Sequence, residues 1–376
     1  MPALYSIPEE LPFLDTLVAG LMRRFGGEPL ALTRLTILLP TRRAARSLGE
    51  AFLRASAGRA LLLPRMVPVG DLDAEELALA GDAGGIDIPP ALPPLKRQLL
   101  LASLIQKWGD GSVAGPWLPG QAVPLARALA DFLDEIHTAR ADVARLRELA
   151  PDRFAEHWQE VLKFLAIVTE AWPKLLAEQA ALDPAERRNR VLAARIAAWQ
   201  RAPPEEPVIA AGLAAGIAAV GDVVAAVARL PRGEIVLDGL DLDIGGMDAV
   251  AADPTHPQHL HARLLGRFGL VPEAVALWPG IETRPAAPRR RLLRAALAPA
   301  AETDRWRRLT GIDKGAIQGL YRLDCDGAQE EAEVIALLMR RALEVPGRTA
   351  ALVTPDRALA RRVAAELKRW SIAIDD

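Results

Sequence analysis

The chain has 376 residues, a formal net charge of −2 and a hydrophobic fraction of 51%, so it can form two or three domains with sizeable cores. The near-neutral charge gives no global basic field of the kind that indicates nucleic-acid binding, and the single cysteine, Cys325, excludes an internal disulfide and a multi-cysteine zinc or iron–sulfur site within these residues. No apolar run reaches the ~18 residues of a membrane helix and no secretory signal pattern is present, so we expect a cytoplasmic protein.

The first predicted elements are a short strand, a loop and a helix within LYSIPEELPFLDTLVAG, from Leu4 to Gly20. A phosphate-binding loop at this place needs G-x-x-x-x-G-K-[ST], because backbone N–H groups enclose the phosphates, the lysine neutralises them and the hydroxyl binds magnesium. The sequence contains neither Gly-Lys-Ser nor Gly-Lys-Thr, and the loop holds Glu9 and Glu10 between two prolines. We therefore predict that no active nucleotide site lies here.

Further strands are predicted wherever a short run is apolar throughout and is followed by a turn residue. These runs are LTILLP (35–40), PVIAAG (207–212), EIVLDG (234–239), AVALWPG (274–280), LYRLDC (320–325) and TAALVTP (349–355). Such runs are typical of strands buried on both faces of a parallel sheet. Amphipathic helices follow two of them, from Thr41 and from Asp356. The pattern predicts an α/β fold with a doubly wound parallel sheet.

The segment between about Asp71 and Trp199 contains no convincing strand. Amphipathic patterns predict helices over 93–108, 122–139 and 153–182, and a further helix with Asp183 as N-cap and Glu186 completing a capping box. We therefore predict an all-helical block inserted between two parts of the α/β domain.

Acidic residues and histidines are the candidates for a metal site. The strand at 207–212 ends in Ala210 and Ala211, where a nucleotide-hydrolysing enzyme would have a carboxylate for magnesium. The next strand supplies carboxylates, which we interpret as a loop of solvated side chains because no phosphate loop accompanies them: Asp238, Asp241 and Asp243. Three histidines lie close together without a defined fourth zinc ligand, so we predict no metal site: His256, His259 and His261.

Two groups of residues are candidates for DNA contact, because each follows a strand end and opens a helix, where arginines and backbone N–H groups can bind phosphate. They are Thr41, Arg42, Arg43 and Arg46, and then Thr354 and Arg357. A solvated helix face is the alternative for both groups. Four tryptophans on helical segments indicate core packing, with base stacking as the alternative: Trp108, Trp158, Trp172 and Trp199. The run PRRRLLR (288–294) is interpreted as a charged linker rather than a phosphate contact.

Seven segments, in this order, resemble the AddB family, which provides the second subunit of the bacterial AddAB helicase–nuclease, in its alphaproteobacterial form. They are FLDTLVAGLMRRFG, LTILLPTRRAARSLGEAFL, GRALLLPRMVPVGDLD, LDPAERRNRVL, PVIAAG, ARLPRGEIVLDGLDLD and RTAALVTPDRALARRVAAELKRW. The resemblance implies a P-loop-NTPase-like fold of the superfamily 1 helicase type with a degenerate nucleotide site. It assigns residues 1–70 and 201–300 to the first motor domain and 71–200 to its helical insertion. Residues 301–376 become a linker and the truncated start of a second motor domain.

The same resemblance implies a non-catalytic region that binds single strands and duplex ends of DNA in a heterodimer with AddA, during double-strand break processing and recombinational repair. The function implied by the resemblance includes recognition of a Chi-type sequence. ATP and magnesium would be used by AddA, so no cofactor is expected here, and the four-cysteine iron–sulfur nuclease domain of AddB proteins has no counterpart in these residues. Two alternatives stay open: an active ATP-dependent helicase with a divergent phosphate loop, and a protein-binding scaffold without DNA contact.

Overall fold

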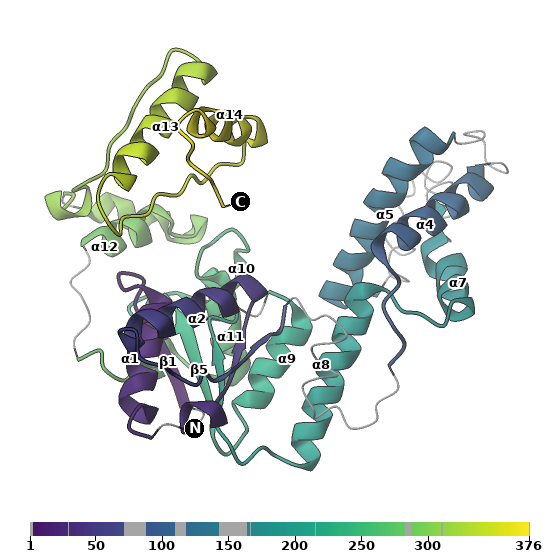
Figure 1. Cartoon of the computed structure of the whole chain (residues 1–376), viewed down its shortest axis with the longest axis horizontal. Helices are drawn as coiled ribbons and strands as arrows, with labels where there is room; N and C mark the ends of the chain where they lie inside the picture. Colours follow the sequence, from purple (N-terminus) through teal and green to yellow (C-terminus); the bar gives the residue numbers. More distant parts are fainter. Residues whose placement is uncertain are drawn as a thin grey trace. The chain divides into compact units, whose positions relative to one another are not determined.

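The computed structural model divides the chain into two compact units, Met1–Ile312 and Asp313–Asp376 (Figure 1). It describes residues 3–28, 30–70, 88–109, 118–142, 164–165, 167–214, 216–282, 288–309 and 311–375. In this part of the chain, none of the helices combines the length and apolar character that crossing a membrane requires.

The first unit is built on a six-stranded sheet in which every pair of neighbouring strands is parallel, in the order β3-β2-β4-β5-β1-β6. The strands are β1 (Ala3–Ile7), β2 (Thr36–Leu39), β3 (Arg65–Pro68), β4 (Val208–Ala211), β5 (Gly233–Asp238) and β6 (Ala276–Leu277). The predicted α/β class with a parallel sheet is confirmed, as are the five apolar runs from the opening run to the run at 274–280. The edge strand β3 was not predicted, because its four residues are largely only part-buried and lack a continuous apolar pattern.

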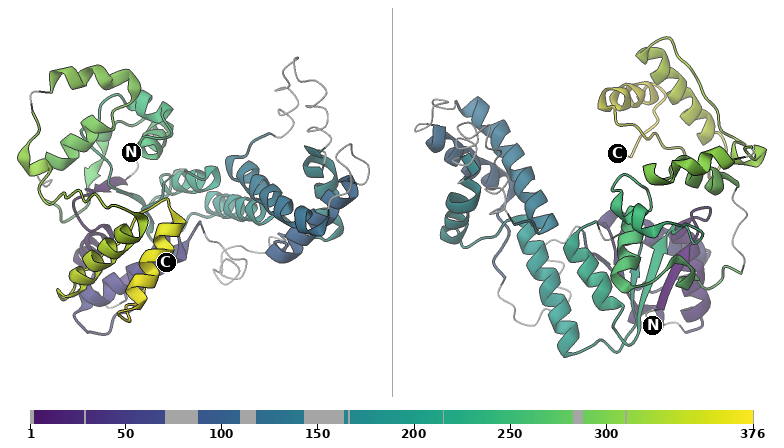
Figure 2. Two further views of the ribbon diagram at one scale, coloured as in Figure 1. Left: turned by 90° about the horizontal axis from the view of Figure 1, so that it is seen from above. Right: turned by 180° about the vertical axis from the view of Figure 1, so that it is seen from behind.

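Helices cover both faces of this sheet (Figures 1 and 2). On one face, α1 (Phe13–Phe25) and α2 (Arg42–Ser56) bury Leu17, Phe52 and neighbouring side chains against strand residues such as Ile209. On the other face, α8 (Pro184–Arg201), α9 (Ala218–Val227) and α11 (His259–Phe268) pack against the alternate strand residues. Successive strand side chains point to opposite faces, so uniformly apolar strands are what a sheet covered on both sides requires.

The described residues between β3 and β4 form helices joined by loops, with one isolated bridge, between Ala91 and Leu182. The helices are α4 (Pro94–Gly109), α5 (Pro119–Ala139), a π-helical turn (Ile167–Ala171) that leads into α7 (Trp172–Glu178), and α8. Much of the long helix predicted at 153–182, including Trp158, lies outside the described residues. Trp172 and Trp199 are buried and Trp108 packs edge-on against Phe164, which confirms the packing role predicted for these three.

The capping box predicted at the start of α8 is wrong, because the carboxylate of Asp183 makes no cap hydrogen bond. It is fully buried and lies 2.7 Å from Nε of Arg97, while Nε1 of Trp172 donates to it at 2.8 Å. Burial disfavours the charged carboxylate, but His137, Arg97 and Trp172 more than offset this effect and lower the pKa of Asp183. A carboxylate that neutralises a buried arginine stabilises the junction of four helices, whereas a cap would stabilise only one.

The second unit packs α13 (Ala328–Leu343) against α14 (Arg357–Lys368) through small and aliphatic side chains. The strands predicted at 320–325 and 349–355 are wrong, since the described residues there form none. Tyr321 and Val353 are 89% and 94% exposed. A strand is stable only when a neighbour pairs with its backbone, and within Asp313–Asp376 no described segment does so.

Gly20 and Gly49 give a matched test of helix packing. A Cβ on Gly20 of α1 would lie 2.1 Å from Nε1 of the buried Trp278, whereas a Cβ on Gly49 of α2 would meet nothing within 4 Å. Gly20→Ala should therefore lower the free energy of unfolding by about 1–3 kcal/mol despite the better helix propensity of alanine. Gly49→Ala should raise it by about 0.5–1 kcal/mol. Urea denaturation measures both, and changes of the same sign would contradict the close approach of α1 to Trp278.

Candidate functional site

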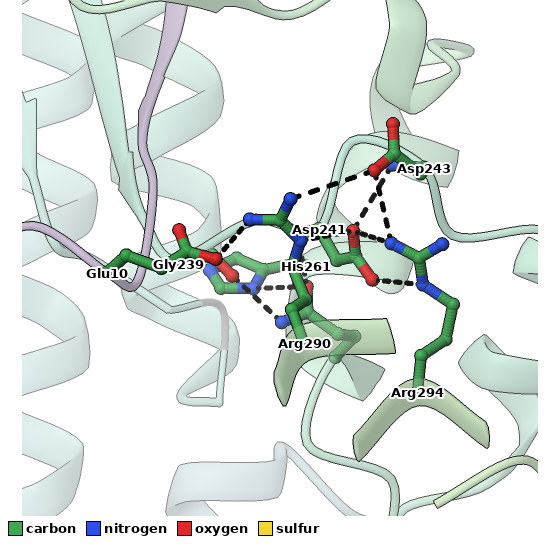
Figure 3. Close-up of polar contacts among 8 residues, drawn as sticks. Glu10, Gly239, Asp241, Asp243, His261, Arg290 and Arg294 are labelled. Carbon is green, nitrogen blue, oxygen red and sulfur yellow. Dashed lines mark hydrogen bonds and ion pairs between the residues drawn. The ribbon is translucent and has the colours of Figure 1, made fainter. Parts of the chain in front are cut away.

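The candidate site lies where β1 and β5 end side by side. After β1 the chain passes to one face of the sheet through α1, and after β5 it passes to the other face through α11. Two neighbouring strands whose connections leave in opposite directions form a topological switch point, where open α/β sheets bind their ligands. Eight residues form a polar cluster there (Figure 3): Glu10, Gly239, Asp241, Asp243, Gln258, His261, Arg290 and Arg294.

The loop after β5 is shaped by Gly239 and by the side chain of Gln258. Gly239 has φ +67°, its N–H donates to the carbonyl of Ile7 at 2.9 Å, and a Cβ on it would lie 3.3 Å from Cβ of Glu9. Only glycine fits this left-handed turn without strain. Gln258 donates from Nε2 to the Gly239 carbonyl at 2.9 Å and accepts from the N–H of Asp241 at 3.2 Å. The side chain of Gln258 thereby holds the loop at Gly239 and at Asp241.

His261 supports the Gln258 side chain from α11. Its Nδ1 lies 3.3 Å from Oε1 of Gln258. Although the ring keeps some exposed surface, loss of hydration lowers the pKa of His261 to about 4. The imidazole is therefore neutral at physiological pH, and it can donate from Nδ1 to the amide oxygen.

Ion pairs tie α12 (Pro288–Ala296) to the cluster. Asp241 is 5% exposed and accepts from Arg294 twice, at 2.6 Å from Nε and 2.5 Å from Nη2, and the same Nη2 lies 3.2 Å from Asp243. Arg290 donates to Glu10 and lies 3.8 Å from Asp241. Burial works against the charged form of Arg294, but its hydrogen bonds and ion pairs with Asp241 and Asp243 more than offset this effect and raise its pKa.

The cluster lies at the switch point, the place where open α/β sheets bind ligands. Its carboxylates, on Glu10, Asp241 and Asp243, outnumber its two guanidinium groups, so its formal charge is −3 plus +2, or −1. A phosphate would have to displace carboxylates from both arginines. The site is therefore a set of ion pairs that joins the strand ends to α12. We call this set the charge lock: Glu10, Asp241 and Asp243 with Arg290 and Arg294.

Two predictions for this region are wrong. The carboxylate of Asp241 is buried and ion-paired rather than solvated, and residues 288–294 begin a helix rather than form a linker. The sequence signal for the lock is the i, i+4 spacing of Arg290 and Arg294, which places both guanidinium groups on one helix face. Their partners lie about 50 and 280 residues earlier in the chain, so nothing local in the sequence indicates them.

The end of β4 is closed by apolar packing. Ala210 and Ala211 are fully buried, and the ring of Phe13 lies 3.3 Å from where a Cβ on Gly212 would stand. Phe13 is the first residue of α1, so the start of that helix packs beside the turn that follows β4.

The first predicted group of DNA-contact residues lies at the same edge of the sheet. Thr41 caps α2 by accepting from the N–H of Ala44 at 3.1 Å, and Arg42, Arg43 and Arg46 are exposed on its first turns. This helix start follows β2, three strands from β1, which corresponds to roughly 14 Å along the edge.

The second predicted group belongs to the other unit. Thr354 accepts from the N–H of Asp356 at 3.0 Å, Asp356 caps α14, and Arg357 is the exposed first residue of that helix. Thr354 and Arg357 lie in Asp313–Asp376, whereas α2 belongs to Met1–Ile312.

The three histidines have separate partners. Nδ1 of His256 accepts from the N–H of Gln258 at 3.0 Å, while Nδ1 of His259 lies 3.4 Å from the carbonyl of Val250. Within the described ranges, no group of three or more histidine, cysteine, aspartate or glutamate side chains could hold a metal ion.

No protein-family model matches the chain. No curated protein matches it either. The role of the site is therefore inferred from its own geometry.

Arg294 provides a test of the charge lock. Arg294→Ala removes the bidentate pair and leaves the carboxylate of Asp241 buried without its closest cation, while Arg290 lies 3.8 Å away, so the free energy of unfolding should fall by about 2–4 kcal/mol. The control is Arg54→Ala, which breaks a pair with Asp15 whose side chains are 58% and 46% exposed and should cost less than about 1 kcal/mol. Equal losses in urea denaturation would mean that the lock is no stronger than a surface ion pair.

Proposed function

We propose that this chain is a non-catalytic, helicase-like region that binds DNA and acts as a scaffold, as the resemblance to AddB implies. The observation that carries the proposal is the charge lock. The switch point that would hold a nucleotide is occupied by Glu10, Asp241 and the arginines of α12, while exposed arginines of α2 lie along the same edge.

The sheet order supports a degenerate motor domain. On the resemblance, β1 precedes the phosphate loop and β4 corresponds to the strand that carries the magnesium acid. β5 lies between them, so the ends of β1 and β4 are two strand spacings apart, or roughly 10 Å. Phosphate and magnesium groups at those two ends could act on one nucleotide, but Pro8–Pro12 and Ala210-Ala211 offer neither. The helices between β3 and β4 would then be the insertion of this motor domain.

DNA binding would use the phosphate backbone. Arg42, Arg43 and Arg46 present positive charge beside the N–H groups that open α2, and contacts of this kind fix a strand without reading its sequence. The motor, with its ATP and magnesium, would be the AddA subunit in a cytoplasmic heterodimer that processes double-strand breaks. Recognition of a Chi-type sequence would need base contacts in addition.

Reversing the charge of α2 tests DNA binding. Arg42→Glu with Arg43→Glu should weaken binding of a labelled single-stranded oligonucleotide at least tenfold, and should make the slope of log K against log salt shallower by about 1.4, at about 0.7 per lost phosphate contact. The matched control is Arg201→Glu with Arg229→Glu, because these exposed arginines precede β4 and β5 and so lie at the opposite edge of the sheet. Unchanged affinity and slope in the α2 variant would favour the scaffold without DNA contact.

An active ATPase is the second candidate, because Asp238 stays exposed at the end of β5 beside the first loop. Calorimetry with ATP and magnesium distinguishes the two functions. We expect no binding at micromolar concentrations, since the first loop lacks a lysine and its Glu9 and Glu10 repel phosphate. Micromolar affinity would overturn the non-catalytic function, and Asp238→Asn would then show whether that residue holds the metal.

A further inference from the structure

The segment from 288 to 309, which contains α12 and a following 3-10 helix (Ala300–Arg308), has a strong local charge. It carries seven arginines against Glu302 and Asp304, a net charge of 7 − 2 = +5, although the whole chain has a net charge of −2. Both helices belong to the first unit. The near-neutral total therefore hides a basic segment of 22 residues.

The arginines of this segment divide into two groups. Arg290 and Arg294 belong to the charge lock and fix α12 to the strand ends. The others are exposed: Arg289, Arg291, Arg305, Arg307 and Arg308. The ion pair of Arg307 with Asp304 spans 4.0 Å between side chains that are 87% and 90% exposed, so it neutralises little charge. The lock thus fixes the helix that carries Arg289 and Arg291. Arg305, which also pairs with Glu302 at 2.8 Å, Arg307 and Arg308 lie exposed on the following 3-10 helix.

An exposed aromatic ring lies among these cations. Trp306 is 48% exposed, and its Nε1 donates to the carbonyl of Ala295 at 2.5 Å, which fixes the ring against the end of α12. It lines a hollow of about 190 Å³ together with Arg291, Arg294 and Arg305. A fixed ring with exposed surface, flanked in sequence by Arg305 and Arg307, has the chemistry of a stacking platform for nucleic-acid bases.

We propose that the surface formed by α12 and Ala300–Arg308 binds single-stranded nucleic acid, with one base stacked on Trp306 and adjacent phosphates contacted by Arg305, Arg307 and Arg308. This inference rests on the proposed function and deepens it, because it names a second contact for the bound strand. A base of a single strand can offer its face to the ring, whereas the interior bases of a duplex are stacked on both sides. A wholly electrostatic partner, such as an acidic peptide, would not require the indole ring.

Variants of Trp306 test the stacking. In fluorescence anisotropy with the full chain and a labelled twenty-residue oligothymidine, Trp306→Ala should weaken binding roughly 5- to 100-fold. Trp306→Phe keeps a ring at this position and should recover most of the affinity. The same variants should change the affinity for a blunt duplex much less. Thermal unfolding of each variant checks that the fold is kept.

Variants of the neighbouring arginines test the phosphate contacts. Arg307→Gln with Arg308→Gln should make the salt slope shallower by about 1.4, at about 0.7 per contact. Arg201→Gln with Arg229→Gln, at the opposite edge of the sheet, should leave the slope unchanged. Polyglutamate serves as a competitor of similar charge.

The outcomes separate this inference from the function on which it rests. If the unmodified chain binds the oligonucleotide and only the Arg42 and Arg43 variant weakens it, the surface proposed here is wrong and the function stands. If Trp306→Ala weakens polyglutamate and oligothymidine equally, the surface binds acidic protein and the inference is overturned. If the unmodified chain binds no oligonucleotide at low salt, both are overturned.

Discussion

The structure depends on one constraint, that all strands of its sheet are parallel. A parallel sheet needs a crossover after each strand, and the crossovers must cover both faces because the strands are apolar on both. The ends of β1, β2, β4 and β5 therefore lie along one edge, where the loops that follow them are close together. Three features considered for function follow from this arrangement: the first loop, the turn at Gly239 and the start of α2.

At the middle of that edge lies the place where open α/β sheets bind ligands. In this chain, the ion-paired side chains of the charge lock lie there. The energetics explain why this arrangement is specific rather than simply strong. Taking Asp241 out of water costs several kcal/mol, and a bidentate arginine offsets that cost only when its geometry is held. Gln258 and Gly239 hold the loop on one side, and the i, i+4 spacing on α12 holds the cations on the other. The main effect of these ion pairs is thus to fix α12 in one position, and their net contribution to the free energy of unfolding is smaller.

Much of the sheet could be predicted from sequence, because β2, β4 and β5 have continuous apolar cores and are followed by glycine or proline. The same pattern failed at 320–325 and 349–355, since an apolar run forms a strand only beside another strand, and nothing in the run says whether one is present. The site was less predictable still. Asp183 has the local pattern of a helix cap and Asp241 that of a solvated loop, yet both are buried by arginines far away in the chain, and a single sequence does not reveal such partners.

The same long-range ion pairs determine which charges of the molecule remain at its surface, where a nucleic acid could contact them. A net charge of −2 argues against a global field that attracts nucleic acid, but it does not describe how the charges are distributed. In the lock, carboxylates neutralise only Arg290 and Arg294, so the arginines with which they share a segment remain at the surface. Lost nucleotide chemistry and local DNA affinity would then have one physical cause. On the proposed function, acidic residues at strand ends that bind no phosphate fix a basic helix, and this helix and the one that follows it present their remaining cations and Trp306 to a strand of DNA.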